Sequence, residues 1–594
     1  MLFSWRLIFY KVRGSTLRVS LQASCILLMV IPILITCVST AIVHRQFLFD
    51  DSFITYRYAK NLADGNGIVF NPGDPPTEGY TPLLLVLLLA PFLKIGLDPL
   101  VITRVLSFLS AIGLSACIFF SAKRRFRCTT ISASIVASIP FLFSDTVVHC
   151  MTGMETMLYT LCLFLCFLAG VQFIRNQSLK WSLIFSSILF LCTLFRPEGF
   201  LLYIAFLILC GIQALRKDSI LLRPLIAGAG LLFAMGMVYG IWKVFHFGYI
   251  LPNAFFIKAN TPFFFSEMGV ASVVDFLVHY SILLALVLSS AILAGTQEDF
   301  LPRESNKVLI WGSIFVTLYV IFFATVDTLQ DIGGRFLYPC MAILVLLSMP
   351  SLVRVIDWMT SDSILKGSAT IGACIMVYLV FQPIYLFQLI TNTKQMIYYG
   401  MRGGGIDDPY SLVQREMQIG KDLAEYPDIS RIRLMVGDAG VIPYFSEAIC
   451  LDPVGLNDTF IARNRDPQAL SDYVYGWEAD VIIGAINKDF TWLQIGHGPM
   501  GNLDYYARDI RADEYFYVGT CRTRDSYDLF FFVRKSSKYL HSLTYFLRER
   551  VVDGWYNILP VPLGSYVPKK DIQLEWTMGK RVGLQERSTL HRMP

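Results

Sequence analysis

Charged residues are scarce in this chain. Asp, Glu, Lys and Arg make up 16% of the 594 residues, whereas soluble domains are typically about a quarter charged. Hydrophobic residues account for 55%, and the mean hydropathy is +0.55. This composition excludes an ordinary soluble enzyme and predicts a polytopic membrane protein with a polar remainder.

Several functional patterns are also missing. The net charge is only +5 and no basic stripe is present, so nucleic-acid binding is not predicted. The 13 cysteines form no CxxC and no His/Cys cluster, so they predict no metal site. Cys450 and Cys521 lie in the polar part and leave a disulfide open. No small-residue cleavage site follows the first apolar run, which we interpret as a signal anchor.

Long uncharged runs are present instead. The first covers 19–43, and the others cover 105–122, 128–144, 156–174, 181–195, 199–215, 224–242, 280–297, 308–326, 336–353 and 367–393. By length these runs predict about eleven transmembrane helices. The stretch 81–93 is short and contains Pro82 and Pro91, so we expect a re-entrant or interfacial helix there.

Basic residues predict the orientation. Arg6, Lys11, Arg13 and Arg18 precede the first run, which places the N-terminus in the cytoplasm. The later basic cluster at 123–127 faces the cytoplasm only if the stretch 81–93 does not cross the membrane. An odd number of crossings then exports the C-terminal region, and a catalytic membrane module at 1–393 precedes an exported domain at 394–594. The first outer loop is 44–98.

Asp50 and Asp51 lie in that first outer loop, seven residues after the first run. Two adjacent acids contribute little to topology, and near a membrane they cost free energy unless water, a cation or a substrate uses them. The same topology brings further Pro- and Gly-interrupted motifs to the outer side, at 78–84, 153–160, 196–199, 251–259 and 331–339. One face is therefore predicted to carry the chemistry.

Carboxylates and cations at one depth suit a particular reaction. A carboxylate can act as general base toward a hydroxyl, while Arg57, Arg196, Lys258 and Arg335 are candidates to neutralise a phosphate. Gly333 and Gly334 allow close backbone approach to a ligand. Together these groups predict transfer of a sugar from a lipid phosphate to a hydroxyl.

Each of these groups also has a purely structural interpretation. Arg57 and Lys258 are suited to contact lipid headgroups as interfacial cations. Glu155 and Glu198 lie near helix starts, where acids favour the helix dipole. The stretch 51–63 has an amphipathic pattern typical of an interfacial helix.

The region after 394 has a soluble pattern. It predicts a helix at 409–427 and strands at 432–436, 448–451, 480–484, 515–519 and 528–533, which indicate a small α/β domain. GDAG at 437–440 is either a strand-to-helix turn or a phosphate- or sugar-binding turn, the turn being favoured. Asp438 and Asp458 are candidate acceptor-binding residues.

Taken in order, the motifs resemble those of the GT-C superfamily of polyprenyl-phosphate-sugar-dependent membrane glycosyltransferases, in particular the mycobacterial terminal arabinofuranosyltransferase and its bacterial relatives. The resemblance rests on the following segments: FDDSFITYRYAKNLADGNGIVFNPG at 49–73, EGYT at 78–81 with Glu78 and Tyr80, GMET at 153–156, RPEG at 196–199, LPNAFFIKA at 251–259 with Asn253, GGRFLYP at 333–339, GDAGVIPYFS at 437–446 and GLND at 455–458.

The resemblance implies a GT-C fold with an aspartate of the first outer loop as catalytic base, and Asp50 is the preferred one of the acid pair. It implies that Arg335 holds the donor phosphate, and that the reaction inverts the anomeric centre in the bacterial inner membrane. No cofactor is required by it. A divalent cation is left open, with Asp51 as its ligand.

The implied partners are a polyprenyl-phosphate-linked sugar, a glycan, glycolipid or protein acceptor, and the lipid bilayer. The segment DTLQDIGGRF at 327–336 departs from the family's usual pattern, so arabinose is not carried over as the donor sugar. A transporter or flippase of a lipid-linked saccharide is the alternative; its charged sites are expected near the bilayer midplane rather than at one rim.

Overall fold

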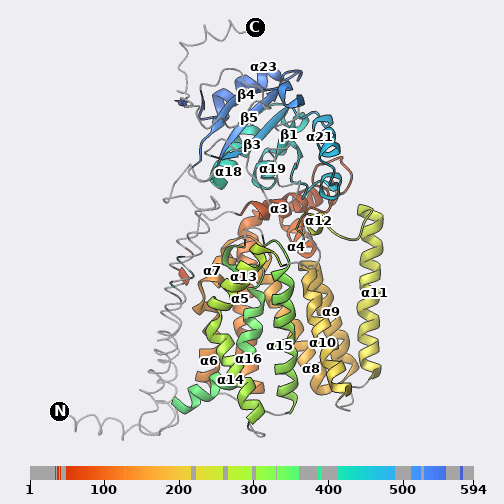
Figure 1. Cartoon of the computed structure of the whole chain (residues 1–594), viewed down its shortest axis with the longest axis vertical. Coiled ribbons are helices and arrows are strands. Elements are labelled where there is room, and N and C mark those ends of the chain that lie inside the picture. Colours follow the sequence, from red (N-terminus) through yellow and green to blue (C-terminus); the bar gives the residue numbers. More distant parts are fainter. Residues whose placement is uncertain are drawn as a thin grey trace, which may run out of the picture.

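The computed structural model describes residues 49–126, 129–215, 222–258, 265–296, 303–328, 331–359, 412–487, 510–523, 527–556 and 576–578, and single residues at 34, 37, 38, 41, 386, 388 and 390. Apart from those single residues, the predicted runs 19–43 and 367–393 lie outside the described part, as does the proposed domain boundary at 394. Two bodies are described: a helical bundle and a sheet domain, with the latter at one end of the bundle (Figure 1).

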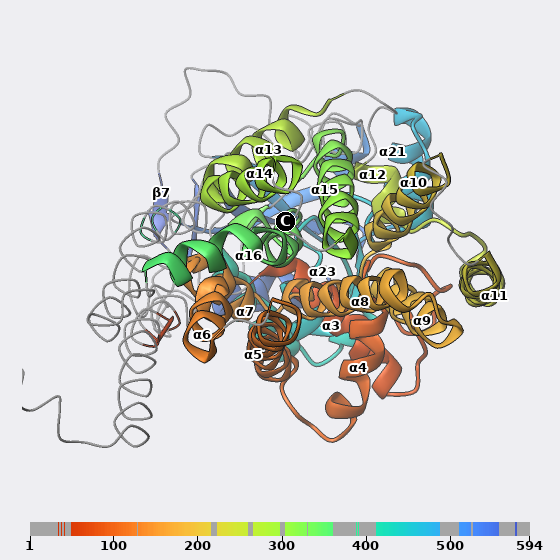
Figure 2. The ribbon, with the colours of Figure 1, turned by 90° about the horizontal axis from the view of Figure 1, so that it is seen from below.

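The bundle consists of apolar helices joined by short connections. Its elements are α4 (Leu83–Lys94), α5 (Pro99–Arg125), α6 (Thr130–Ser138), η1 (Ile139–Leu142), α7 (Ser144–Met151), α8 (Thr156–Asn176), α9 (Leu179–Phe195), η2 (Pro197–Phe200), α10 (Leu201–Leu215), α11 (Leu222–Phe247), α12 (Asn253–Lys258), α13 (Glu267–His279), α14 (Ser281–Thr296), α15 (Arg303–Ala324), η3 (Ile332–Gly334) and α16 (Pro339–Met359). Helix α11 lies at the edge of the bundle (Figure 2), where Ser182 of α9 donates a hydrogen bond to the Pro224 carbonyl oxygen of α11.

Several of these helices are long and apolar enough to cross a membrane. Among the described residues five qualify outright, and seven if two bent helix pairs each count as one crossing. One bent pair joins the predicted run 280–297 to α13, a helix that the sequence analysis did not predict because Glu267, Asp275 and His279 interrupt its apolar pattern. Helix α4 forms as expected, and its 12 residues are too few to span a bilayer.

The sheet domain combines helices with a seven-stranded sheet. Its elements are α18 (Leu412–Ala424), η4 (Ile429–Arg431), β1 (Arg433–Val436), α19 (Val441–Ser446), β2 (Ile449–Leu451), α20 (Thr459–Arg463), α21 (Pro467–Gly476), β3 (Val481–Asn487), η6 (Ile510–Glu514), β4 (Tyr515–Cys521), β5 (Tyr527–Arg534), α23 (Leu540–Phe546), η7 (Leu547–Val551), β6 (Gly554–Tyr556) and β7 (Trp576–Met578). The helix and the five strands predicted from the sequence are confirmed as α18 and β1–β5; β6 and β7, with three residues each, were not predicted.

The strand order is β2-β1-β3-β5-β4-β6-β7. Strands β2, β1 and β3 are parallel, and the others pair antiparallel. Helix α19 connects β1 to β2, and α20 and α21 lead on to β3, so β1 lies between the two strands that follow it. At such a reversal of strand order, the carboxyl ends of parallel strands leave a crevice in which open α/β sheets commonly bind ligands.

Helix α3 (Asp50–Ala63) lies between the bundle and the sheet domain (Figure 1). Ten of its 14 residues are buried, because both bodies pack against it. A helix is confirmed at the predicted 51–63, whereas its placement at the membrane interface stays a prediction. Its surroundings are protein on two sides, so the helix joins the two bodies.

Candidate functional site

The acid pair begins α3, and its first member faces the sheet domain. Asp50 Oδ2 accepts a hydrogen bond from the Gly440 amide at 3.1 Å, and Oδ1 accepts one from the Val441 amide at 2.6 Å. Gly440 ends the GDAG turn that follows β1, and Val441 is the first residue of α19. The side chain thereby satisfies backbone donors that a helix start leaves without intrahelical partners.

The contact between Asp50 and the turn is close. A Cβ added at Gly440 would lie 2.0 Å from the Asp50 carbonyl oxygen, so a residue without a side chain is required there. Asp50 is only 8% exposed. Burial raises the pKa of Asp50 well above its ordinary value, and the charge of Asp438 raises it further, while the Val441 and Gly440 amides act in the opposite direction.

Arg57, seven residues further along α3, also binds the sheet domain. Its guanidinium donates to the carbonyl oxygens of Pro443 and Ala448, the latter at 2.7 Å. It also donates to Phe70 O and Asn71 Oδ1. A buried guanidinium that is bonded to four oxygens of the protein is a structural group in this arrangement, so the predicted phosphate contact of Arg57 has no support in the geometry.

Asp51 faces the bundle. Its Oδ2 lies 3.1 Å from Nη2 of Arg335, and the side chain is 25% exposed. The guanidinium carbon of Arg335 lies 4.7 Å from the ring centroids of Phe49 and Phe336. The structure therefore brings together two of the residues predicted from the sequence, an acid of the first loop and the arginine after the glycine pair, which lie 284 residues apart.

The glycine pair directs Arg335 toward α3. Gly333 and Gly334 have φ angles of +64° and +61°, a region that other residues rarely adopt. The carbonyl oxygen of Gly333 accepts a hydrogen bond from His149 Nε2 at 2.9 Å. His149 was not singled out in the sequence because a single histidine in an apolar run carries little signal.

Arg196 joins three predicted motifs in one network. Its Nε lies 2.6 Å from Glu155 Oε1, and its Nη1 lies 3.7 Å from Glu198 Oε1. The same Nη1 donates to the carbonyl oxygen of Arg335 at 3.2 Å. Arg196 is thus held by two acids and supports the backbone that carries Arg335, which makes it a positioning group.

The remaining predicted motif residues lie beside the sheet domain. Glu78 pairs with Lys243 at 2.7 Å, a partner that the sequence analysis missed. Tyr80 is buried against Tyr58, and Asn253 donates to the Leu456 carbonyl oxygen at 3.2 Å. Lys258 ends the short helix α12, and nothing further is described of its side chain.

The two acids predicted to bind acceptor have different positions. Asp438 lies in the GDAG turn, close enough to raise the pKa of Asp50. Asp458 caps α20 by accepting from the Ile461 amide and also accepts from the Tyr473 hydroxyl. Asp458 is therefore a structural cap. Cys450 and Cys521 are buried free thiols, so the disulfide left open by the sequence does not form.

In the part of the chain that the structure describes, no three His, Cys, Asp or Glu side chains come together in a way that could hold a metal ion. The divalent cation at Asp51 stays a prediction. The arrangement offers a partly exposed carboxylate beside a guanidinium at the sheet-facing end of a membrane bundle. Such a pair can accept a proton from a hydroxyl and neutralise an anion at one place.

The chain resembles known proteins mainly in its fold. Residues 410–532, which overlap the sheet domain, match a family described as a domain of unknown function (DUF8728). The search of curated proteins finds no match.

The chain is similar in structure to ArnT from Cupriavidus metallidurans bound to undecaprenyl phosphate, with a TM-score of 0.50 and 11% sequence identity, over 78% of this chain and 93% of that one. The apo state of the same protein gives a TM-score of 0.47 at 11% identity, over 77% and 93% of the two chains. The first likeness confirms the predicted fold class, a GT-C type helical membrane protein with a C-terminal sheet-containing domain.

Proposed function

We propose that this protein is an inverting glycosyltransferase that moves a sugar from a polyprenyl-phosphate donor to a hydroxyl of a cell-envelope glycan, glycolipid or protein. The observation that carries the proposal is the 3.1 Å contact between Asp51 and Arg335. In a GT-C fold, this pair supplies a base and a phosphate-binding cation at the end of the bundle. The undecaprenyl phosphate held by the similar ArnT structure supports a prenyl phosphate as the lipid part.

The ion pair suggests how the site is activated. Without donor, Asp51 neutralises Arg335. A donor phosphate competes for the guanidinium, because a phosphate offers several anionic oxygens to its fork of N–H donors. Asp51 is then released toward the acceptor. Donor binding thus produces both the neutralised leaving group and the free base.

The reaction then proceeds as a single displacement. Asp51 takes the proton of the acceptor hydroxyl, and the acceptor oxygen forms a bond to the anomeric carbon. The bond between that carbon and the phosphate oxygen breaks, and polyprenyl phosphate leaves with the electron pair. Arg335 stabilises the charge on the leaving phosphate, and attack opposite the leaving group inverts the anomeric centre.

We assign the base to Asp51 rather than to Asp50. Both oxygens of Asp50 already accept hydrogen bonds from the Gly440 and Val441 amides, and its raised pKa leaves less of it ionised. Asp51 is more exposed and contacts the cation that would hold the phosphate. The first acid of the pair, preferred by family resemblance, instead holds the sheet domain over the site.

The proposal places the reaction at the outer face of a bacterial inner membrane, with the N-terminus in the cytoplasm. The resemblance to the terminal arabinofuranosyltransferase suggests a cell-envelope acceptor. The sheet domain lies over the acid pair through the GDAG turn, so an acceptor would reach Asp51 beside that turn.

The test is transfer by purified protein in nanodiscs. Synthetic polyprenyl-phosphate sugars are offered with envelope acceptors, and release of polyprenyl phosphate is followed for wild type, Asp51→Asn and Asp50→Asn. Loss of a general base costs roughly 10²–10⁴-fold in rate. We expect a loss of that size in Asp51→Asn and less than about tenfold in Asp50→Asn, since an amide oxygen still accepts one hydrogen bond.

Equal turnover in wild type and Asp51→Asn would exclude the proposed mechanism. A wild type that releases no polyprenyl phosphate, yet moves the intact lipid-linked sugar between leaflets in an Asp51-independent manner, would favour the flippase alternative. Binding of undecaprenyl phosphate measured beside each variant separates loss of chemistry from loss of donor.

A further inference from the structure

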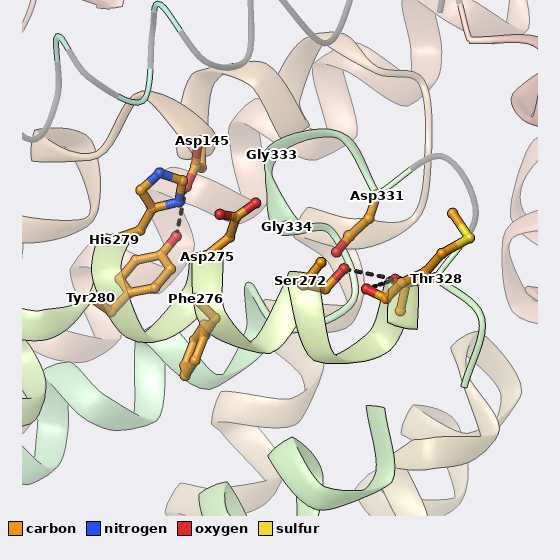
Figure 3. Close-up of a pocket in the computed structure, with 12 residues that line it drawn as sticks. Asp145, Ser272, Asp275, Phe276, His279, Tyr280, Thr328, Asp331, Gly333 and Gly334 are labelled. Atoms are coloured by element: carbon orange, nitrogen blue, oxygen red, sulfur yellow. Dashed lines mark hydrogen bonds between the residues drawn. The ribbon is translucent and has the colours of Figure 1, made fainter. Parts of the chain in front are cut away.

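A cavity of about 190 Å³ lies between α13 and the loop that carries the glycine pair. One face of α13 contributes Met268, Ala271, Ser272, Asp275, Phe276 and His279 to its lining. These positions recur at intervals of three and four residues, as neighbours on one side of a helix do. Figure 3 shows Ser272, Asp275, Phe276 and His279 on α13, with Asp331, Gly333 and Gly334 on the facing loop.

The polar lining of this cavity combines carboxyl groups with the hydroxyls of Ser272, Tyr280 and Thr328 and the imidazole of His279. Three carboxyl groups contribute, from Asp145, Asp275 and Asp331, and no lysine or arginine is among the described lining residues. Asp145 accepts from the Tyr280 hydroxyl at 2.9 Å, and Asp331 accepts from the Phe336 amide at 3.2 Å, which holds both in position. Ionised carboxylates only accept hydrogen bonds, so the cavity suits a ligand rich in donors and disfavours an anion.

The cavity adjoins the proposed phosphate site. Gly334 lines it, and the next residue is Arg335, whose guanidinium contacts Asp51. This loop therefore lines the cavity as far as Gly334 and presents a cation at the next residue. A ligand that carries a neutral ring joined to a phosphate has the same order of groups.

We propose that the cavity binds the sugar ring of the donor and selects rings that carry hydroxyls and no anionic group. This inference rests on the proposed function. Its size fits the assignment: about 190 Å³ lies below the roughly 300–1,000 Å³ of pockets for drug-sized ligands, which suits a single ring. Phe276 adds an aromatic side chain to the lining, as is usual in small-molecule sites.

Binding, measured separately for ring and lipid, tests this assignment. The probes are undecaprenyl phosphate alone, the same lipid carrying a neutral hexose, and the lipid carrying the corresponding hexuronic acid. Affinities are measured in nanodiscs for wild type, Asp275→Asn and Ala271→Phe. Asp275 is exposed at the cavity and holds no loop hydrogen bond that the structure describes, whereas Ala271→Phe reduces the space without changing the charge.

We expect wild type to bind the hexose lipid at least about tenfold more tightly than the uronic acid lipid, a difference of ~1.4 kcal/mol. Asp275→Asn should reduce this difference in affinity between the two sugar lipids, since it removes one of the charges that repel the uronic acid. Ala271→Phe should weaken both sugar lipids about tenfold or more, and neither variant should change binding of undecaprenyl phosphate. Turnover should retain its kcat in Asp275→Asn while KM for the hexose donor rises.

Two matched controls lie on the same helix outside the cavity lining. Glu267→Gln removes a carboxylate, and Val274→Phe adds a ring at a side chain that is 51% exposed; both should bind all three probes as wild type does. Equal binding of hexose and uronic acid lipids by wild type, or equal losses in Ala271→Phe and Val274→Phe, would overturn the cavity assignment while leaving the transferase proposal intact. Failure of wild type to bind undecaprenyl phosphate would instead remove the proposed function, and the inference with it.

Discussion

The two residues of the acid pair, Asp50 and Asp51, contact different parts of the molecule. On one side of α3, Asp50 and Arg57 bond to the sheet domain and are buried. On the other side, Asp51 is partly exposed and faces Arg335 of the bundle. Consecutive residues of an α-helix point about 100° apart, so neighbours in sequence meet different surroundings. The side of α3 that carries Asp50 and Arg57, here called the docking side, holds the two bodies together. The side that carries Asp51, the bundle side, is left for chemistry.

After the loss already expected for Asp51→Asn, the largest effect should come from removing the cation on the bundle side. Arg335→Gln leaves Asp51 without its partner and the donor phosphate without a charge, and we expect kcat/KM to fall by roughly 10²-fold, from the loss of charge-assisted hydrogen bonds worth about 1.5–3 kcal/mol. Arg335→Lys keeps the charge but lacks the bidentate geometry of the guanidinium, so its kcat/KM should lie between those of wild type and Arg335→Gln. Steady-state release of polyprenyl phosphate measures kcat/KM for all three proteins. Full activity in Arg335→Gln would contradict the assignment of the chemistry to the side of α3 that faces the bundle.

A smaller effect is expected from crowding the docking side. Gly440→Ala places a Cβ 2.0 Å from the Asp50 carbonyl oxygen, and such overpacking costs about 1–3 kcal/mol. Amide exchange should therefore increase at residues 440–446 and in α3. Gly476→Ala is the matched control in the same domain, because a Cβ there meets nothing within 4 Å. The same exchange pattern in both variants would show that the docking contact is not specific.

The smallest effect is a pH dependence of the docking. Burial raises the pKa of Asp50 in the docked state, whereas a separated carboxyl keeps its ordinary value. The docked state therefore holds the proton to higher pH, and its stability falls as pH rises through the docked pKa. The melting temperature of wild type should decline relative to Asp50→Asn as pH increases from about 5 to about 8. A constant difference across this range would contradict the buried, proton-holding state of Asp50.

Much of the fold could be read from the sequence because its signals are local. Uncharged runs located α5, α8 and α10, and short apolar runs located β1 to β5. Helix α13 was missed, since Glu267, Asp275 and His279 interrupt its apolar run. Asp275 and His279 line the cavity, so two of the residues that concealed the helix also shape the cavity.

The sequence predicted which residues belong to the site better than it predicted what each of them does. The motifs that hold Asp51, Arg335 and Arg196 were all expected on one side, and their contacts bring them together. Which acid faces the bundle depends on the rotation of α3, and which arginine is already bonded depends on partners far away in sequence. Arg57 and Asn71, for example, bind residues more than 370 positions later. Such pairings leave no local pattern.

The contact between Asp50 and the GDAG turn also bears on how this chain could be recombined. The crevice at the end of β1 is occupied by a carboxylate from the other end of the polypeptide, so α3 and the sheet domain fit each other as a pair. A chimera that exchanges only the C-terminal domain would bring a foreign turn onto Asp50 and Arg57. Transplanting residues 49–80 together with the sheet domain should preserve the joint, and homologous domains would be expected to be inherited as this discontinuous unit.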